Sequence, residues 1–289
     1  MSVSIVVASC SAIPSTNDAF RVNGTGYSND KFNAVIEALA TGEQFKITDG
    51  KVNSDTYSTI LRTLVRYESY RQWATDIGLT ESAADKAAAK AKAESSQDWN
   101  VYPDALRELV VNLNTADLVM ARAQVPARED LKAMYERAPA STGAICMSHI
   151  IVATKAEADR VIDRLDAGEK FADVAKDVSI EPAAKESGGS LGMSPTNPCQ
   201  RIQDAQLSLD GDFMTAAVNA KTGVPTGPVK TSFGWHVIVN RPFDEIEESL
   251  RETISEGPGV LMLSGWMTTA DIEIDSKFGY WNTARGVIE

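Results

Sequence analysis

The chain has 289 residues, of which 43% are hydrophobic and 24% are charged, a composition typical of a folded protein with about two domains. Its net charge of −12 argues against a nucleic-acid-binding protein, because binding to phosphate backbones depends on Lys and Arg. No run of about 18 apolar residues predicts a membrane-spanning helix. The three cysteines have no metal-site spacing, and the chain has only two histidines, His149 and His236.

Residues 1–19 are interpreted as the remnant of a signal sequence followed by a polar linker. Val7-Ala8-Ser9-Cys10 resembles a lipobox, in which small residues precede a cysteine that is lipidated after signal cleavage. However, no Lys or Arg precedes Arg21, whereas an export signal normally begins with a basic region. Two alternatives follow: an extracytoplasmic protein with a lipid anchor at Cys10, or a cytoplasmic protein if Met1 is the true start.

Residues 20–142 are predicted to be mostly helical after a short strand at 20–27. Ser28 is a predicted N-cap, and the apolar residues that follow it have helical spacing. Further amphipathic or helix-favouring segments continue the pattern, over 54–78, 81–97, 103–123 and 128–137. The segment 81–97 is rich in Ala, Lys and Glu, so it is expected to be solvated.

The composition changes near residue 143. A β-rich segment at 146–152 precedes helices from 154 and at 171–178, a glycine-rich loop at 187–192 and a helix at about 211–220. A predicted hairpin at 227–239 then ends a small α+β domain with a mainly antiparallel sheet. Residues 244–270 are predicted to be helical, and the alternating residues 271–275 to form a strand.

Five segments within 143–243 resemble, in order, the parvulin family of peptidyl-prolyl isomerases. They are Ser148-His-Ile-Ile-Val, Gly168-Glu-Lys-Phe-Ala-Asp-Val-Ala, Gly188-Gly-Ser-Leu-Gly, Asp212-Phe-Met-Thr-Ala-Ala and Gly227-Pro-Val-Lys-Thr-Ser-Phe-Gly-Trp-His-Val-Ile. The flanks, with Val22-Asn-Gly and Asp275-Ser-Lys-Phe-Gly-Tyr-Trp-Asn, resemble SurA/PrsA-type extracytoplasmic foldases. The expected fold is α+β. A discontinuous helical chaperone-like domain, 20–142 completed by 244–289, holds an inserted parvulin domain at 143–243.

The resemblance implies a proline pocket and a pair of histidines beneath it. Leu191, Leu209, Phe213 and Phe233 would surround the proline ring, with His149 and His236 on adjacent strands. The histidines are not expected to be metal ligands, because Cys146 at i−3 would point to the opposite face of the strand. No metal or other cofactor is expected.

Two departures from the family pattern concern the same site. Glu181 stands where parvulins commonly carry Cys or Asp, so it either keeps a negative charge near the twisting carbonyl or points into solvent. An insertion at 194–208 separates the glycine-rich loop from the pocket helix, which affects the alignment at Leu209. If Cys10 is lipidated, Cys146 and Cys199 remain, and we expect either a disulfide between them or two inert cysteines.

The resemblance implies prolyl isomerisation and folding assistance for extracytoplasmic proteins. The segment Val152-Ala-Thr-Lys holds a single Lys and therefore no basic cluster for a phosphate, so unphosphorylated Xaa–Pro bonds are the expected substrates. The expected partners are unfolded or nascent exported polypeptides, without nucleic acid. The alternative is a non-catalytic client-binding chaperone with a degenerate parvulin domain.

Overall fold

The computed structural model describes residues 12–13, 17–45, 52–192 and 197–289, and the chain divides into two compact units. The pocket unit comprises Gln124–Thr269 and Thr283–Gly286. The N-terminal unit comprises the described residues up to Ala123, together with Ala270–Asn282 and Val287–Glu289. None of the helices in the described ranges is long and apolar enough to cross a membrane.

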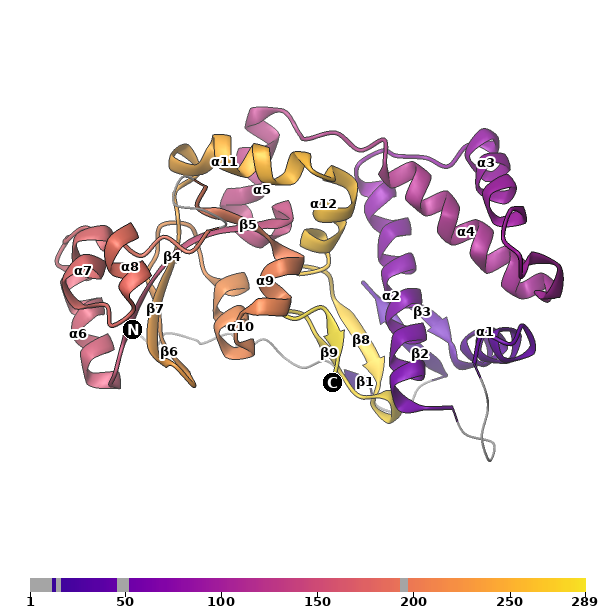
Figure 1. Ribbon diagram of the computed structural model, residues 1–289, viewed down its shortest axis with the longest axis horizontal. Helices are drawn as coiled ribbons and strands as arrows, with labels where there is room; N and C mark the ends of the chain where they lie inside the picture. Colours follow the sequence, from indigo (N-terminus) through magenta and orange to yellow (C-terminus); the bar gives the residue numbers. More distant parts are fainter. Residues whose placement is uncertain (1–11, 14–16, 46–51, 193–196) are drawn as a thin grey trace. The chain divides into compact units, whose positions relative to one another are not determined.

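The pocket unit is built on a four-stranded sheet of order β5-β4-β7-β6, in which every neighbouring pair is antiparallel (Figure 1). Its strands are β4 (Ala144–Val152), β5 (Cys199–Arg201), β6 (Thr226–Thr231) and β7 (Gly234–Asn240). Its helices are α5 (Arg128–Arg137), η2 (Pro139–Thr142), α6 (Lys155–Asp166), α7 (Phe171–Val178), α8 (Pro182–Ser187), α9 (Ile202–Ser208), α10 (Gly211–Asn219), α11 (Phe243–Ser255) and α12 (Pro258–Trp266).

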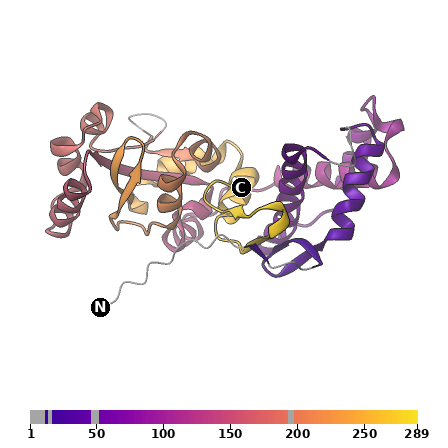
Figure 2. The ribbon, with the colours of Figure 1, turned by 90° about the horizontal axis from the view of Figure 1, so that it is seen from below.

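Helices cover both faces of this sheet, and both views show α6 and α7 on one side of the strands and α9 and α10 on the other (Figure 1, Figure 2). All nine residues of β4 are consequently buried. Because side chains alternate along a strand, Ile150 and Val152 pack against α6 and α7, whereas Ile145 and Met147 pack against α9 and α10. His149 belongs to the second set and faces the α10 side.

A third core cluster joins the amino end of β4 to the helices that flank it. Cys146 and Cys199 pack there with Leu131 and Tyr135 of α5 and with four apolar residues of α11, namely Phe243, Ile246, Leu250 and Ile254. Helices α5, α11 and α12 therefore belong to the same compact unit as the parvulin-like segment. The sequence-based bounds had placed 124–142 and 244–269 in the helical domain, and the structure differs from them on this point.

The N-terminal unit combines helices with a second four-stranded sheet of order β1-β8-β2-β3. Its strands are β1 (Ala12–Ile13), β2 (Asp18–Val22), β3 (Thr25–Ser28), β8 (Ile272–Asp275), β9 (Trp281–Asn282) and β10 (Val287–Ile288), the last two forming a separate pair. Its helices are α1 (Asn29–Thr41), α2 (Ser54–Asp76), α3 (Ala83–Glu94), η1 (Trp99–Val101), α4 (Asp104–Met120) and η3 (Ser276–Phe278).

The return of the chain to the N-terminal sheet is confirmed by strand pairing. Strand β8 lies antiparallel to β2, with Ile274 opposite Phe20 and Ile272 opposite Val22. Residues 270–282 therefore complete a sheet begun more than 250 positions earlier, while the helices before them do not.

The fold class expected from the sequence, α+β with a small antiparallel sheet flanked by helices, is confirmed. One local expectation was wrong, because the helix expected over 244–270 breaks at Gly257-Pro258. Helix α8 ends where the glycine-rich loop was expected to begin, and β5 and α9 lie within the insertion, for which no element was predicted. The segment around α3 is also less solvated than expected, because Ala89 and Ala93 are buried where α3 packs on α4.

Candidate active site

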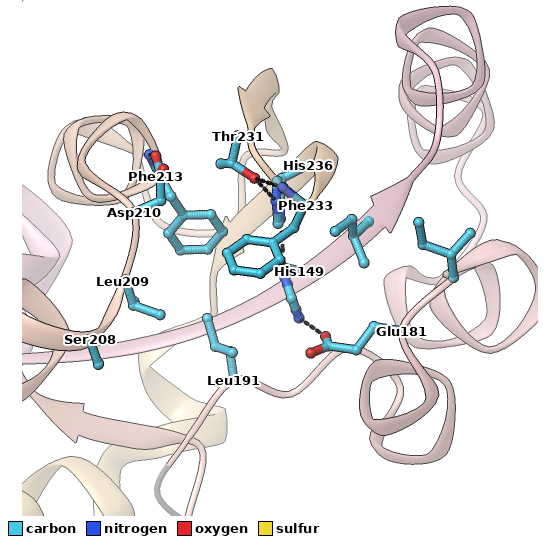
Figure 3. A pocket seen from close by; sticks show the side chains of 12 residues that line it. His149, Glu181, Leu191, Ser208, Leu209, Asp210, Phe213, Thr231, Phe233 and His236 are labelled. Atoms are coloured by element: carbon cyan, nitrogen blue, oxygen red, sulfur yellow. Dashed lines mark hydrogen bonds and ion pairs between the residues drawn. The ribbon is translucent and has the colours of Figure 1, made fainter.

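A pocket of about 320 Å³ opens on the α10 side of the sheet (Figure 3). Strands β4, β6 and β7, the loop before α8, the loop after it and the segment from α9 to α10 all contribute to its lining. The lining residues are His149, Ile151, Ile180, Glu181, Leu191, Ser208, Leu209, Asp210, Phe213, Thr231, Phe233 and His236.

The two histidines lie side by side at the base of this pocket. His149 is opposite Ile238 in the β4–β7 ladder and His236 is opposite Ile151, so the imidazoles share one face at diagonal positions. Their ring centroids are 5.6 Å apart with an interplanar angle of 18°, and each residue is only 5% exposed. The structure therefore brings together the chain's two histidines as a stacked, buried pair.

A continuous series of polar contacts passes through this pair. Nε2 of His149 lies 2.8 Å from Oε2 of Glu181, Nδ1 of His149 lies 3.4 Å from Nδ1 of His236, and Nε2 of His236 lies 2.9 Å from Oγ1 of Thr231. A carboxylate only accepts, so His149 donates from Nε2 and accepts at Nδ1. His236 then donates from Nδ1 and accepts at Nε2 from the Thr231 hydroxyl. One consistent arrangement of protons thus satisfies all four groups with both rings neutral.

Burial favours these neutral forms. The pKa of His236 is lowered to about 4, first by desolvation and then by the neighbouring His149, while Asp210 acts in the opposite direction. Desolvation also lowers the pKa of His149, although the Glu181 carboxylate opposes this shift. At neutral pH the base of the pocket therefore presents two uncharged imidazoles.

Backbone contacts from the loops around α8 fix the position of His149 and of Glu181. The His149 N–H donates to the carbonyl of Gly189, and Ile180 N–H donates to the carbonyl of Ile151. Gly189 has a φ of +88°, and a Cβ there would meet the His149 carbonyl at 2.6 Å. This glycine is therefore required for the loop after α8 to approach β4, and the Ile180–Ile151 hydrogen bond holds the loop that carries Glu181 against the same strand.

Apolar side chains form the walls above the histidines. The Phe213 ring stands edge-on to both imidazoles, with centroids 6.0 Å from His149 and 5.2 Å from His236. Leu191 and Leu209 lie beside it (Figure 3). Phe213 is 3% exposed, whereas Phe233 and Ile180, which also line the pocket, are 75% and 54% exposed. The pocket is thus closed and apolar near Phe213 and open and apolar at Phe233 and Ile180.

Every residue that the sequence analysis assigned to the proline pocket lines this one cavity, from His149 and Glu181 to Phe233 and His236. Glu181 contacts His149 and does not point away into solvent. Cys10 lies outside the described residues. The sequence analysis missed Thr231 and Asp210, although both had a signal: Thr231 lies within the quoted hairpin motif, and Asp210 precedes a helix and is its N-cap.

The residues described by the structure contain no cluster of three or more His, Cys, Asp or Glu side chains that would hold a metal ion. Cys146 lies on the opposite face of β4 from His149 and packs with α5 and α11. A nucleophilic pair of Cys146 with His149 therefore does not form.

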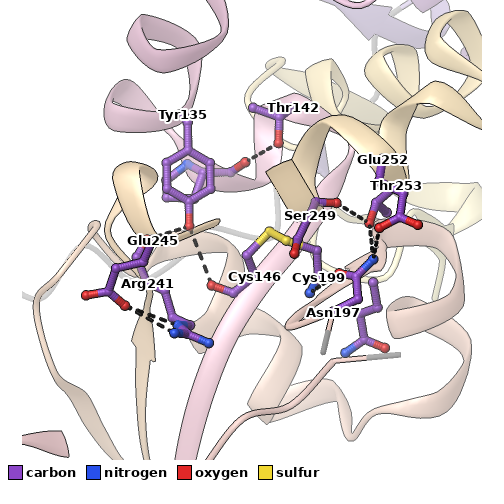
Figure 4. The surroundings of a disulfide bond; sticks show 12 residues. Tyr135, Thr142, Cys146, Asn197, Cys199, Arg241, Glu245, Ser249, Glu252 and Thr253 are labelled. Carbon is purple, nitrogen blue, oxygen red and sulfur yellow. Dashed lines mark hydrogen bonds and ion pairs between the residues drawn. A yellow bond between two sulfur atoms is a disulfide. The ribbon is translucent and has the colours of Figure 1, made fainter. Parts of the chain in front are cut away.

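A disulfide joins Cys146 of β4 to Cys199 of β5, the pairing proposed from the sequence (Figure 4). The two cysteines are directly opposite each other in the strand pair, and both are fully buried. Nearby, Asn197 Oδ1 accepts a hydrogen bond from the Cys199 N–H, and the Tyr135 hydroxyl donates to the Arg241 carbonyl. Cys199 lies between Leu191 and Leu209 in sequence, so the link anchors the segment that carries both pocket leucines.

Comparisons with known proteins place a recognised domain over this site. Residues 149–241, about a third of the chain, match the family "Rotamase: PPIC-type PPIASE domain". "Foldase protein PrsA" of Clostridium botulinum strain Hall is 38% identical over 118 residues, which is 38% of this chain and 33% of the relative. That of Clostridium acetobutylicum is 34% identical over 149 residues, covering 47% of this chain and 42% of the relative.

Solved structures were matched as well. The parvulin NmPin of Nitrosopumilus maritimus is 29% identical, covering 34% of this chain and 96% of that chain at a TM-score of 0.29. PrsA from Bacillus subtilis is 21% identical, covering 88% of this chain and 93% of that chain at a TM-score of 0.31. The chain spans only about a third to two fifths of the two curated foldases named above. The pocket, the histidine pair and most of the sheet beneath them thus lie in residues 149–241, the part of the chain that matches the PPIC-type rotamase domain.

Proposed function

We propose that this chain is a peptidyl-prolyl cis-trans isomerase that acts on unphosphorylated Xaa–Pro bonds in unfolded polypeptides. The observation that supports it best is the apolar pocket closed by Phe213 above two neutral, stacked imidazoles. Its volume of about 320 Å³ exceeds that of a proline ring and leaves room for the flanking backbone.

Rotation about a prolyl bond needs no nucleophile, metal or cofactor. The barrier of roughly 18–20 kcal/mol comes from amide resonance, which the twisted transition state loses. A low-dielectric pocket disfavours the charge-separated planar amide more than the twisted form, so the apolar walls at Leu191, Leu209 and Phe213 lower the barrier. Neutral imidazoles suit this task, because buried positive charge would instead stabilise the planar carbonyl dipole.

In this proposal His149 and His236 form the floor of the site, and Glu181 is a positioning residue. Its carboxylate accepts from Nε2 of His149 and thereby selects one tautomer for both rings. Thr231 completes the arrangement from the other end through Nε2 of His236. The negative charge of Glu181 also acts on the pocket, since the side chain belongs to its lining.

The absence of Lys and Arg from the described lining residues favours unphosphorylated substrates, because a phosphate dianion needs a cationic partner. The relatives are named foldases, and we extend that role to this chain as prolyl isomerisation combined with client binding. The clients would be unfolded or nascent exported polypeptides, held in part by the N-terminal unit.

An extracytoplasmic location, with a lipid anchor at Cys10, fits this role. The buried Cys146–Cys199 disulfide supports it, because structural disulfides persist mainly in oxidising compartments. Labelling intact cells with a membrane-impermeant reagent, and mass spectrometry of the mature N-terminus, test the location and the anchor separately.

The activity itself is tested with a short proline peptide by following cis-to-trans conversion, and with the refolding of a proline-limited protein. We expect acceleration in both assays. If the folded protein accelerates neither but still binds unfolded clients, the alternative of a non-catalytic client-binding chaperone replaces the enzyme.

A further inference from the structure

We propose that the pocket selects prolines that stand next to a Lys or Arg, and that Glu181 and Asp210 provide this selectivity. The inference rests on the proposed isomerase function and names the substrate class of the same site. The charged side chains that line the pocket are all acidic.

Glu181 and Asp210 are the acidic residues of the lining, and the lining residues that the structure describes include no Lys or Arg. The two imidazoles add no positive charge, because burial keeps them neutral at physiological pH. A peptide that enters the pocket therefore meets two carboxylates and no opposing cation.

Neither carboxylate is neutralised by an ion pair with Lys or Arg in the described part of the chain. The partner of Glu181 is the neutral His149, and its side chain is 44% exposed. Asp210 accepts hydrogen bonds from the N–H groups of Asp212 and Phe213 at the start of α10. The side chain of Arg285 lies close to Gly211 at the start of α10, but Arg285 does not line the pocket.

The two carboxylates lie on opposite sides of the pocket, Asp210 on the side of Phe213 and Glu181 beyond His149 (Figure 3). The Asp210 charge reaches the centre of the site, since it acts on the pKa of His236. Low-dielectric walls strengthen such fields within a cleft. A basic residue beside the bound proline would therefore be attracted and an acidic or phosphorylated one repelled.

The open rim of the pocket also suits the stem of a long basic side chain. Ile180 and Phe233 line the pocket and are 54% and 75% exposed. The methylene groups of Lys or Arg pack on such apolar surface while the charged end stays in water, and a cation also binds over an aromatic ring. Ile180 is adjacent to Glu181 in sequence, so the apolar contact and the charge lie close together.

The test uses the full chain and two peptide series, Ala-Xaa-Pro-Phe and Ala-Ala-Pro-Xaa, with Xaa equal to Lys, Ala, Gln or Glu. We expect kcat/KM to rank Lys above Ala and Gln above Glu in at least one series. The Lys-to-Glu ratio should be about tenfold at low ionic strength and should fall to about threefold or less at 0.5 M salt.

Two variants that each remove one negative charge, Glu181→Gln and Asp210→Asn, test whether these carboxylates cause the preference for Lys over Glu peptides. The second keeps a side chain that still caps α10. Each should lower the Lys-to-Glu ratio, a readout that is independent of any overall loss of activity. Glu186→Gln is the matched control, because it removes one charge from the exposed face of α8 outside the pocket and should leave the ratio unchanged.

The outcomes separate this inference from the proposed function. Equal kcat/KM for all peptides, or a preference for Glu, would overturn the charge selectivity while leaving the isomerase intact. If no peptide is isomerised, the isomerase proposal fails. The dissociation constants of the same peptides, measured by NMR titration, then decide the selectivity, and equal affinities for Lys and Glu peptides would refute it.

Discussion

Glu181 reaches His149 with an Oε2–Nε2 distance of 2.8 Å, and this one contact decides which nitrogen of each histidine carries a proton. Because His149 must then accept at Nδ1, His236 must donate to it and accept from Thr231. A carboxylate at the edge of the pocket thus orders a pair of buried rings, and the first prediction follows from that dependence.

Glu181→Gln should lower kcat/KM on a neutral proline peptide about tenfold, equivalent to ~1.4 kcal/mol of transition-state stabilisation. The amide oxygen can still accept from His149, so the variant removes charge while retaining the hydrogen bond. Glu181→Ala should lose more, because it also leaves the imidazole N–H without its partner. Activity equal to that of wild type in both variants would show that Glu181 is merely a partly exposed loop residue.

Phe213→Ala should reduce kcat/KM about a hundredfold, because it removes the wall against the proline ring and the edge contact to both imidazoles. Met214→Ala is the matched control, since Met214 is buried on the same helix and does not line the pocket. Both variants should lose about 2–5 kcal/mol of stability. Only the first should lose activity per folded molecule, as measured at a temperature where both remain folded by circular dichroism.

Acidification should destabilise the pocket unit between about pH 6.5 and pH 4. The pKa of His236 falls from 6.5 to about 4 on folding, so in this range the unfolded chain binds a proton that the folded chain does not. The free energy of unfolding is therefore highest, with respect to this group, above pH 6.5. It decreases toward pH 4 by at most about 1.4 kcal/mol per pH unit.

Urea unfolding at a series of pH values measures this slope. His236→Asn removes the titrating group, so its slope should be shallower than that of wild type over the same range. Identical slopes would mean that other groups cause the acid sensitivity. Isomerase activity should also decline toward pH 4, as protonation puts charge beneath the substrate.

Loss of the disulfide should destabilise the pocket unit by about 4 kcal/mol in the chain-entropy model, because the link closes a loop over 53 positions. We expect Cys146→Ser and Cys199→Ser each to lower the urea midpoint, and a reductant to have the same effect on wild type. Alkylation under denaturing, non-reducing conditions followed by mass spectrometry should leave both cysteines unmodified. Alkylation at both positions would show that the two thiols are free.

The two compact units should respond separately to core substitutions. Ile274 of β8 is fully buried opposite Phe20 in the N-terminal sheet, and Leu250 of α11 is fully buried in the cluster beside the disulfide. Ile274→Ala should speed amide exchange in β2 and leave peptide isomerisation unchanged. Leu250→Ala should instead speed exchange in β4 and β5. Faster exchange in both units from either change would contradict this division.

Local signals predicted much of this structure. Ser28 was expected to begin a helix and another helix was expected from residue 54, and the side chains of Ser28 and Asn53 accept from the N–H groups of Lys31 and Asp55. Gly257-Pro258 carried an equally local signal, since the residue before a proline is disfavoured in a helix, yet the helix was predicted to continue through it.

The features that escaped prediction depend on tertiary contacts. Strand β5 has three residues, too few for a periodic pattern, and it exists because Cys199 pairs with Cys146 on β4. The direction of the Glu181 side chain depends on its contact with the buried imidazole of His149, which lies 32 positions away in the chain. The parvulin-like segments predicted which residues lie around the pocket. The series of contacts from Glu181 to Thr231 could be established only from the three-dimensional structure.

The two faces of strand β4 have different functions, so the site and the core both depend on the register of this strand. His149 and Ile151 face the pocket, while Cys146, Ile150 and Val152 face the opposite cores. Because the side-chain period of a strand is two, deleting one residue before His149 would exchange the two sets. The imidazole would be buried among aliphatic side chains, and the disulfide partner would be turned away from Cys199. Single-residue insertions and deletions in this strand should therefore abolish the site and the covalent link together, whereas the loop at 168–170 offers a place where length can change without altering either.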